Sequence, residues 1–198
     1  MLLTSPTPAR RGGESSQDNS HCNTFSSQGK RCFWRLYRVN TGNRGTCAVY
    51  SARLSAYVPM RIFVIAPSHA NLPDATIEIS AIDRRHQATI LRGHVRDPDI
   101  AEKLDVLSFD VIWWISHGNA EGILLSDGLL SIGGVRQYLR TSGARLGVLN
   151  TCESESVARS IAIGGNADMI CTIGEIDNKD AIRLGSLLAV ELAKADDF

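Results

Sequence analysis

The pattern of apolar and polar residues divides the chain near residue 60. Polar residues, glycine and proline dominate residues 1–31, and such a segment buries too little apolar surface to offset its ordering entropy. We therefore expect residues 1–60 to form a polar, basic extension that is disordered or irregular. Within this extension, residues 32–39 alternate enough between apolar and polar positions for a strand to be the alternative interpretation.

Residues 61–198 are expected to form one folded domain, because segments of strand length alternate there with amphipathic segments. Runs typical of strands occur at residues 61–66, 88–95, 109–115, 146–149 and 168–173. Helical spacing occurs at residues 97–107, 131–139, 154–162 and 178–195, while residues 73–86 fit an extended stretch that leads into a helix. Strands separated by helices predict crossover connections and a parallel sheet. The expected fold class is α/β: a three-layer, mostly parallel sheet of flavodoxin-like outline with helices on both faces.

Local signals set several of the expected boundaries. Asp97 is the expected N-cap of one helix because a proline follows it, and Ser131 is the expected N-cap of another. Asp127-Gly128 predicts a tight turn. Trp113 and Trp114 alternate between the faces of a central strand and are expected in the core.

Charge and cysteine content exclude several classes of function. The net charge is zero, with about +6 on residues 1–60 and about −6 on residues 61–198, so nucleic acid is not an expected partner. No apolar run approaches the roughly 18–20 residues of a membrane helix, and no secretory signal begins the sequence, so no membrane partner is expected. The five cysteines form no Cys-x-x-Cys pair, which argues against a disulfide framework or a zinc site and favours a reducing cytoplasm.

Two side chains with complementary chemistry each follow an apolar run. His117 comes after residues 109–115, and Cys152 comes after residues 146–149. The carboxyl ends of parallel strands meet at one edge of a sheet, so the imidazole and the thiol could meet there if the two strands are neighbours. An imidazole can take the thiol proton and later protonate a leaving amine. Cys152 also precedes a helix N-terminus, whose partial positive charge favours a thiolate.

Gly118, directly after the histidine, would let a substrate carbonyl approach closely. The backbone N–H groups of Gly118 and Cys152 are the predicted donors to a tetrahedral oxyanion. Structural roles are the alternative for His117 and Cys152, because a lone histidine or cysteine in an α/β domain usually packs or hydrogen bonds. Cys171 lies inside an apolar run and is expected to be a small buried hydrophobe.

Other charged and imidazole groups offer weaker candidates. Glu175 and Asp177, in the loop after the last expected strand, could form an acidic pocket for a lysine or arginine side chain. A solvated loop with a helix cap is the alternative for these two acids. No motif surrounds His69, His86 or His94, so these histidines are expected at the surface or in packing roles.

Three segments resemble the CHAT branch of the caspase-like cysteine peptidases (clan CD), namely Ile115–Gly118, Gly122–Gly128 and Leu146–Ser154. The resemblance spans roughly residues 61–198 and implies a caspase-type fold, with His117 as general base and acid and Cys152 as nucleophile. It implies hydrolysis of a polypeptide substrate, without a metal or an organic cofactor, in a bacterial conflict, cell-death or signalling pathway. A separate sensor or adaptor protein is the partner that the resemblance implies.

Two departures from the family pattern bear on the expected site. The family's domain usually continues past its last helix, so a C-terminally truncated domain is one interpretation of residues 61–198. Several relatives carry an acid two residues before the cysteine to bind a basic side chain, whereas this chain has Asn150, which supplies no charge. Asn150 is therefore a candidate pocket residue, with Glu175 and Asp177 as the nearest candidate acids.

Two alternative functions remain open. A catalytically inactive caspase-like scaffold that binds a partner is the main alternative, because the family's pocket acid is missing. A different α/β hydrolase or an amidotransferase that uses Cys152 is the weaker one. Those enzymes favour glycines around the nucleophile, and residues 150–154 contain none.

Overall fold

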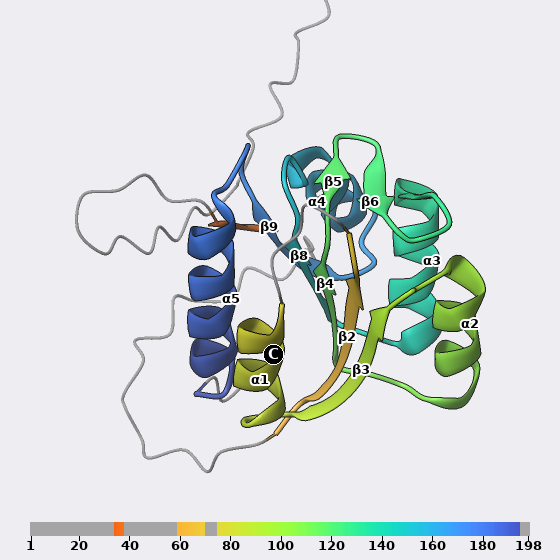
Figure 1. Ribbon diagram of the computed structural model, residues 1–198. Coiled ribbons are helices and arrows are strands. Elements are labelled where there is room, and N and C mark those ends of the chain that lie inside the picture. Colours follow the sequence, from red (N-terminus) through yellow and green to blue (C-terminus); the bar gives the residue numbers. More distant parts are fainter. Residues whose placement is uncertain (1–33, 38–58, 70–74, 195–198) are drawn as a thin grey trace, which may run out of the picture.

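The computed structural model describes residues 34–37, 59–69 and 75–194, which form a six-stranded sheet between two layers of helices (Figure 1). Five strands of this sheet run parallel and one edge strand runs antiparallel. The strand order is β1-β9-β8-β4-β2-β3. The six strands are β1 (Trp34–Tyr37), β2 (Arg61–Pro67), β3 (Gln87–Gly93), β4 (Val111–Ile115), β8 (Leu146–Asn150) and β9 (Asp168–Thr172).

The helices cover both faces of the sheet, which confirms the expected three-layer α/β class. On one face, α1 (Thr76–Asp83) packs against α5 (Asn178–Leu192). The other face carries α2 (Asp97–Val106), α3 (Ile132–Ser142) and α4 (Glu155–Ile163). The parallel strands follow the order of a flavodoxin-like sheet, in which ligands bind beyond the carboxyl ends of the strands.

The apolar runs form strands because both faces of the central sheet are buried. Every residue of β4 and of β8 is buried, as expected for inner strands of a parallel sheet. Trp114 belongs to the core cluster under α2, α3 and α4, whereas Trp113 belongs to the cluster under α1 and α5. The expectation that both tryptophans are core residues is therefore confirmed.

A small antiparallel sheet interrupts the chain between β4 and α3. It consists of β5 (Gly118–Asn119), β6 (Gly122–Leu124) and β7 (Leu129–Ser131). The expected turn at Asp127-Gly128 joins β6 to β7, and the N–H of Leu125 donates to the Gly128 carbonyl at 2.8 Å. This small sheet begins at Gly118, directly after His117, and therefore holds the backbone that follows the histidine.

Strand β1 completes one edge of the main sheet. It pairs antiparallel with β9, so that Leu36 lies opposite Ile170. The Tyr37 hydroxyl donates to a Glu155 carboxylate oxygen on α4 at 2.6 Å. Residues 34–37 therefore form a strand, as the alternative interpretation expected. Their hydrogen-bond partners lie in β9, far along the chain, so the local sequence could not reveal this pairing. The rest of the expected extension, residues 1–33 and 38–58, lies outside the described residues.

One expected helix boundary is wrong by one residue. Arg96, rather than Asp97, is the N-cap of α2, and the Asp99 carboxylate accepts the Arg96 N–H at 2.8 Å. Asp97 lies in the first turn instead, where its carboxylate accepts the Tyr138 hydroxyl. The cap at Ser131 is confirmed, because its hydroxyl accepts the N–H of Gly134 at 3.3 Å.

None of the described helices combines the length and the apolar character that a bilayer crossing requires.

Candidate active site

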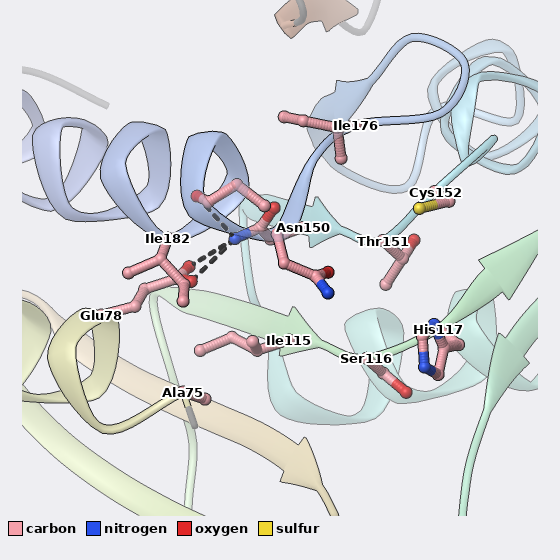
Figure 2. A pocket seen from close by; sticks show the side chains of 12 residues that line it. Ala75, Glu78, Ile115, Ser116, His117, Asn150, Thr151, Cys152, Ile176 and Ile182 are labelled. Atoms are coloured by element: carbon pink, nitrogen blue, oxygen red, sulfur yellow. Dashed lines mark hydrogen bonds between the residues drawn. The ribbon is translucent and has the colours of Figure 1, made fainter. Parts of the chain in front are cut away.

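A pocket lies beyond the carboxyl ends of β4 and β8, with α1 and the start of α5 beside it (Figure 2). Its enclosed volume is about 30 Å³, which accommodates about two water-sized groups. The lining combines an apolar wall with polar groups from both strand ends. The lining residues are Ala75, Glu78, Ile115, Ser116, His117, Asn150, Thr151, Cys152, Ile176, Asn178, Ala181 and Ile182.

The structure brings His117 and Cys152 to the same pocket. Strands β4 and β8 pair in parallel, with Ile115 opposite Asn150, so each of the two residues lies two positions beyond a paired strand end. The following turns touch, because a Cβ placed on Gly118 would lie only 2.9 Å from the Thr151 hydroxyl oxygen. Glycine at position 118 is therefore required for this close approach.

The side chains of His117 and Cys152 thus line the same crevice, at the strand ends from which the sequence predicted their meeting. Both are partly exposed to solvent, as a nucleophile and a base need to be. No hydrogen bond between the thiol and the imidazole occurs in the described part of the chain. Catalytic hydrogen bonds often form or shorten only when substrate binds, so the missing bond does not exclude a catalytic pair.

The turn that carries Cys152 is held by hydrogen bonds from two hydroxyl groups. The Thr151 carbonyl accepts the Ser154 hydroxyl at 2.9 Å and also accepts the Thr172 hydroxyl of β9. Glu153 has a φ of +52°, and its N–H donates to the Gly174 carbonyl at 3.1 Å. A left-handed conformation is unfavourable for glutamate, so the surrounding contacts maintain a strained turn directly after Cys152.

Backbone donors lie at the rim of the pocket. The Leu124 N–H donates to the His117 carbonyl at 2.9 Å, which makes these residues a hydrogen-bonded pair of the β5–β6 ladder. In antiparallel ladders bonded and non-bonded pairs alternate, so the Gly118 N–H points away from β6. The Cys152 N–H donates to no acceptor among the described residues. These two N–H groups remain the predicted oxyanion donors.

The imidazole of His117 lies in a partly desolvated place beside a second imidazole. Burial lowers the pKa of His117, and the nearby His69 lowers it further. The two ring centroids are 5.4 Å apart. A lowered pKa keeps His117 neutral near pH 7, which is the form that can accept a proton.

His69 is a site residue that the sequence analysis assigned to the surface or to packing. Its Nε2 lies 3.2 Å from the Leu124 carbonyl and 3.3 Å from the Ser116 hydroxyl oxygen. The available signal was its position, because His69 follows the carboxyl end of β2 just as His117 follows β4. Of the other two histidines, His86 is buried against the Ala189 carbonyl at 3.0 Å and His94 is exposed.

A buried carboxyl group forms the inner end of the pocket. Glu78 on α1 is fully buried and accepts the Trp113 indole N–H at 2.8 Å. The Asn150 amide nitrogen lies 2.9 Å and 2.7 Å from its two carboxylate oxygens. Burial raises the pKa of Glu78 to about 8, against the opposing effect of the hydrogen bonds from Asn150 and Trp113. No sequence pattern marked Glu78 as a candidate site residue.

The two acids that the sequence suggested as pocket residues lie outside the pocket. Glu175 and Asp177 are both exposed, and neither lines the cavity. The Asp177 carboxylate accepts the Lys179 N–H at 2.8 Å and so caps α5, as the alternative interpretation expected. Their neighbours Ile176 and Asn178 line the cavity instead.

Gly185 lets α5 approach Glu78. A Cβ at this position would lie 2.1 Å from a Glu78 carboxylate oxygen. We expect Gly185→Ala to lower the free energy of unfolding by about 1–3 kcal/mol, since overpacking outweighs the better helix propensity of alanine. Gly133→Ala in α3 is the matched control, because its Cβ would meet only the Ser131 hydroxyl oxygen at 3.6 Å.

Urea unfolding of the two glycine variants and the parent chain measures this difference. Gly133→Ala is expected to be neutral or stabilising by up to about 1 kcal/mol. Equal stability of the Gly133 and Gly185 variants would show that α5 can move away from the carboxyl group without cost.

Comparison with known proteins adds no family assignment. No family model matches the chain, and no curated protein matches it. Among the described residues, no group of three or more histidine, cysteine or acidic side chains is arranged to hold a metal ion.

Proposed function

We propose that the chain is a cysteine endopeptidase of the caspase-like, CHAT-type class, with Cys152 as nucleophile and His117 as general base and acid. The observation that carries this proposal is the contact between the Gly118 and Thr151 turns. This contact holds the two candidate groups at the rim of one pocket. The strand-end positions of His117 and Cys152 are consistent with the sequence resemblance described above.

The proposed reaction has two stages, acylation of Cys152 and hydrolysis of the resulting thioester. His117 takes the thiol proton as the Cys152 sulfur attacks the carbonyl carbon of the peptide bond, and the negative charge moves to the carbonyl oxygen. The N–H groups of Gly118 and Cys152 stabilise this oxyanion. The C–N bond then breaks as His117 protonates the leaving amine, which leaves a thioester. Water, deprotonated by His117, hydrolyses the thioester, and the returning proton restores the thiol.

The wider setting of the proposal comes from the resemblance alone. It suggests a role in a bacterial conflict, cell-death or signalling pathway, with a sensor or adaptor protein as partner. A cytoplasmic location is proposed because the cysteine pattern fits a reducing compartment.

Alkylation by iodoacetamide tests whether His117 activates the thiol. At pH 6.5 an ordinary thiol with a pKa near 8.5 is only about 1% ionised, so a paired thiol should react faster. We expect His117→Ala to slow alkylation of Cys152 by about tenfold or more at this pH. The matched control is His94→Ala, which removes an exposed imidazole outside the pocket and should leave the rate unchanged.

Mass spectrometry of the alkylated chain assigns the modified cysteine, and the buried Cys171 serves as an internal unreactive thiol. An alkylation rate that follows ordinary thiol ionisation, with no effect of His117→Ala, would contradict an activated pair. That outcome would favour the alternative function, an inactive caspase-like scaffold. Asn150, which supplies no charge at the position where several relatives carry an acid, is the feature that motivates this alternative.

A further inference from the structure

We propose that His69 is a positioning residue for His117, because its ring packs against the His117 imidazole and restricts the orientation of that imidazole beside Cys152. The proposal rests on the proposed function, since it needs His117 to act as the base. His69 lies two positions beyond the carboxyl end of β2, as His117 does beyond β4 and Cys152 beyond β8. Since β4 lies between β2 and β8 in the sheet, His117 is placed between His69 and Cys152.

The first argument is that no hydrogen bond orients the His117 imidazole. Its two ring nitrogens have no hydrogen-bond partner among the residues that the structure describes. A base that activates a nucleophile is normally oriented by a third group, usually through a hydrogen bond to its second ring nitrogen. Here the neighbouring group is the His69 ring, whose centroid lies 5.4 Å from that of His117 at an interplanar angle of 46°. This separation lies within the range of about 4.5–7 Å at which aromatic rings attract each other.

The second argument is that the His69 ring is itself anchored to the backbone that holds His117. The Ser116 hydroxyl donates to the Leu124 carbonyl at 2.5 Å, so its hydrogen lies between these two oxygens. The His69 Nε2 lies 3.2 Å from the Leu124 carbonyl oxygen and 3.3 Å from the Ser116 hydroxyl oxygen. Both oxygens therefore present lone pairs to Nε2, which must carry a hydrogen and donate it. Because the Leu124 N–H donates to the His117 carbonyl at 2.9 Å, one residue of β6 holds both histidines.

The third argument is that His69 is not placed to act as the base itself. It does not line the pocket that contains Cys152, and β4 separates its strand from β8. The hydrogen on its Nε2 is directed at Leu124 and Ser116 rather than at the pocket. An effect of His69 on the thiol must therefore pass through His117.

A double-mutant cycle on the alkylation of Cys152 by iodoacetamide at pH 6.5 tests this dependence. We expect His69→Ala to slow alkylation about three- to tenfold, which is the range that one aromatic pair supports. In a chain that already carries His117→Ala, adding His69→Ala should cause no further slowing, because no imidazole remains to be positioned. His94→Ala removes an exposed imidazole outside the pocket and serves as the matched control with an unchanged rate.

Two further variants separate the ring contact from the hydrogen bond. His69→Phe keeps a ring without an N–H, whereas His69→Gln keeps an N–H donor without a ring. Neither of them, nor His69→Ala, carries the imidazole charge, so a difference among the three does not arise from charge. We expect His69→Phe to alkylate within about twofold of the parent rate and His69→Gln to be as slow as His69→Ala. The reverse order would overturn the proposal, since the hydrogen bond to Leu124 would then matter instead of the ring.

The outcomes distinguish failure of this role from failure of the proposed function. If His117→Ala leaves alkylation unchanged, the activated pair and the positioning role both fail. If His117→Ala slows alkylation but His69→Ala does not, or slows it equally with and without His117, the positioning role alone fails. Thermal unfolding followed by circular dichroism checks that each variant is folded. If His69→Ala does not fold, the comparison of His69→Phe with His69→Gln decides the question.

Discussion

Replacing Cys152 by alanine is expected to lower kcat/KM for peptide hydrolysis by about 10⁴-fold or more, because the variant has no atom able to form the thioester. The fold should persist. Cys152 is only partly buried and lies in a turn that Ser154 and Thr172 hold through the Thr151 carbonyl rather than through the sulfur. Cleavage assays on purified protein, with circular dichroism as a check on folding, measure both effects.

Cys171→Ala is the matched control for this experiment, since the same substitution is made in the buried interior of β9. It should reduce stability by about 1 kcal/mol through lost packing while leaving cleavage intact where the chain is folded. Undiminished hydrolysis by the Cys152 variant would place the nucleophile elsewhere and remove the basis of the proposed mechanism.

The contribution of Glu78 to the stability of the chain is expected to fall as the pH rises from about 4.5 to about 8. Its folded-state pKa of about 8 lies above the ordinary value of 4.5, so the folded chain binds this proton more tightly than the unfolded chain. Stability from this group is complete below the unfolded pKa and is lost as the pH passes through the folded pKa. A difference of this size corresponds to at most about 5 kcal/mol.

Glu78→Gln has no titratable proton at this position, so the pH-dependent contribution of residue 78 to stability is lost. The stability of the variant relative to wild type should therefore increase with pH over the same interval, whatever constant offset the altered hydrogen bonds introduce. Urea unfolding at several pH values measures the difference, and Asp83→Asn, which replaces an exposed acid on the same helix, should show no comparable trend. Burial lowers the pKa of His86, so the contribution of His86 to stability decreases as the pH falls. This contribution is the same in all these chains, so it cancels when their stabilities are compared. A difference that does not change with pH would mean that Glu78 is already ionised in the fold.

The strands and the two strand-end residues were predictable because their signals are local. Apolar runs mark β2, β4, β8 and β9, and the crossover rule then places the residues after β4 and β8 at one edge. Neither step needs knowledge of which helix packs where. The positions of His117 and Cys152 follow from this logic, and the same logic applied to β2 would have drawn attention to His69.

Glu78 was harder to predict because its role depends on packing between distant segments. The α1 sequence alternates like a strand over residues 75–80, and this pattern obscures the helical face on which Glu78 and Ile82 lie four residues apart. A charged residue on the face shared with Ile82 was the available signal. Its partners Trp113, Asn150 and Gly185 come from three other elements, so only the tertiary structure reveals the cluster.

The pairing of β1 with β9 has a consequence for how the molecule behaves among copies of itself. A strand at the margin of a sheet offers unpaired N–H and carbonyl groups on which a foreign strand can assemble. Residues 34–37 occupy those groups on β9 from within the same chain, and the Tyr37 hydroxyl fastens them to Glu155. This pairing moves the free margin of the sheet from β9 to a strand of only four residues, and a short edge strand is a poorer template for a foreign strand.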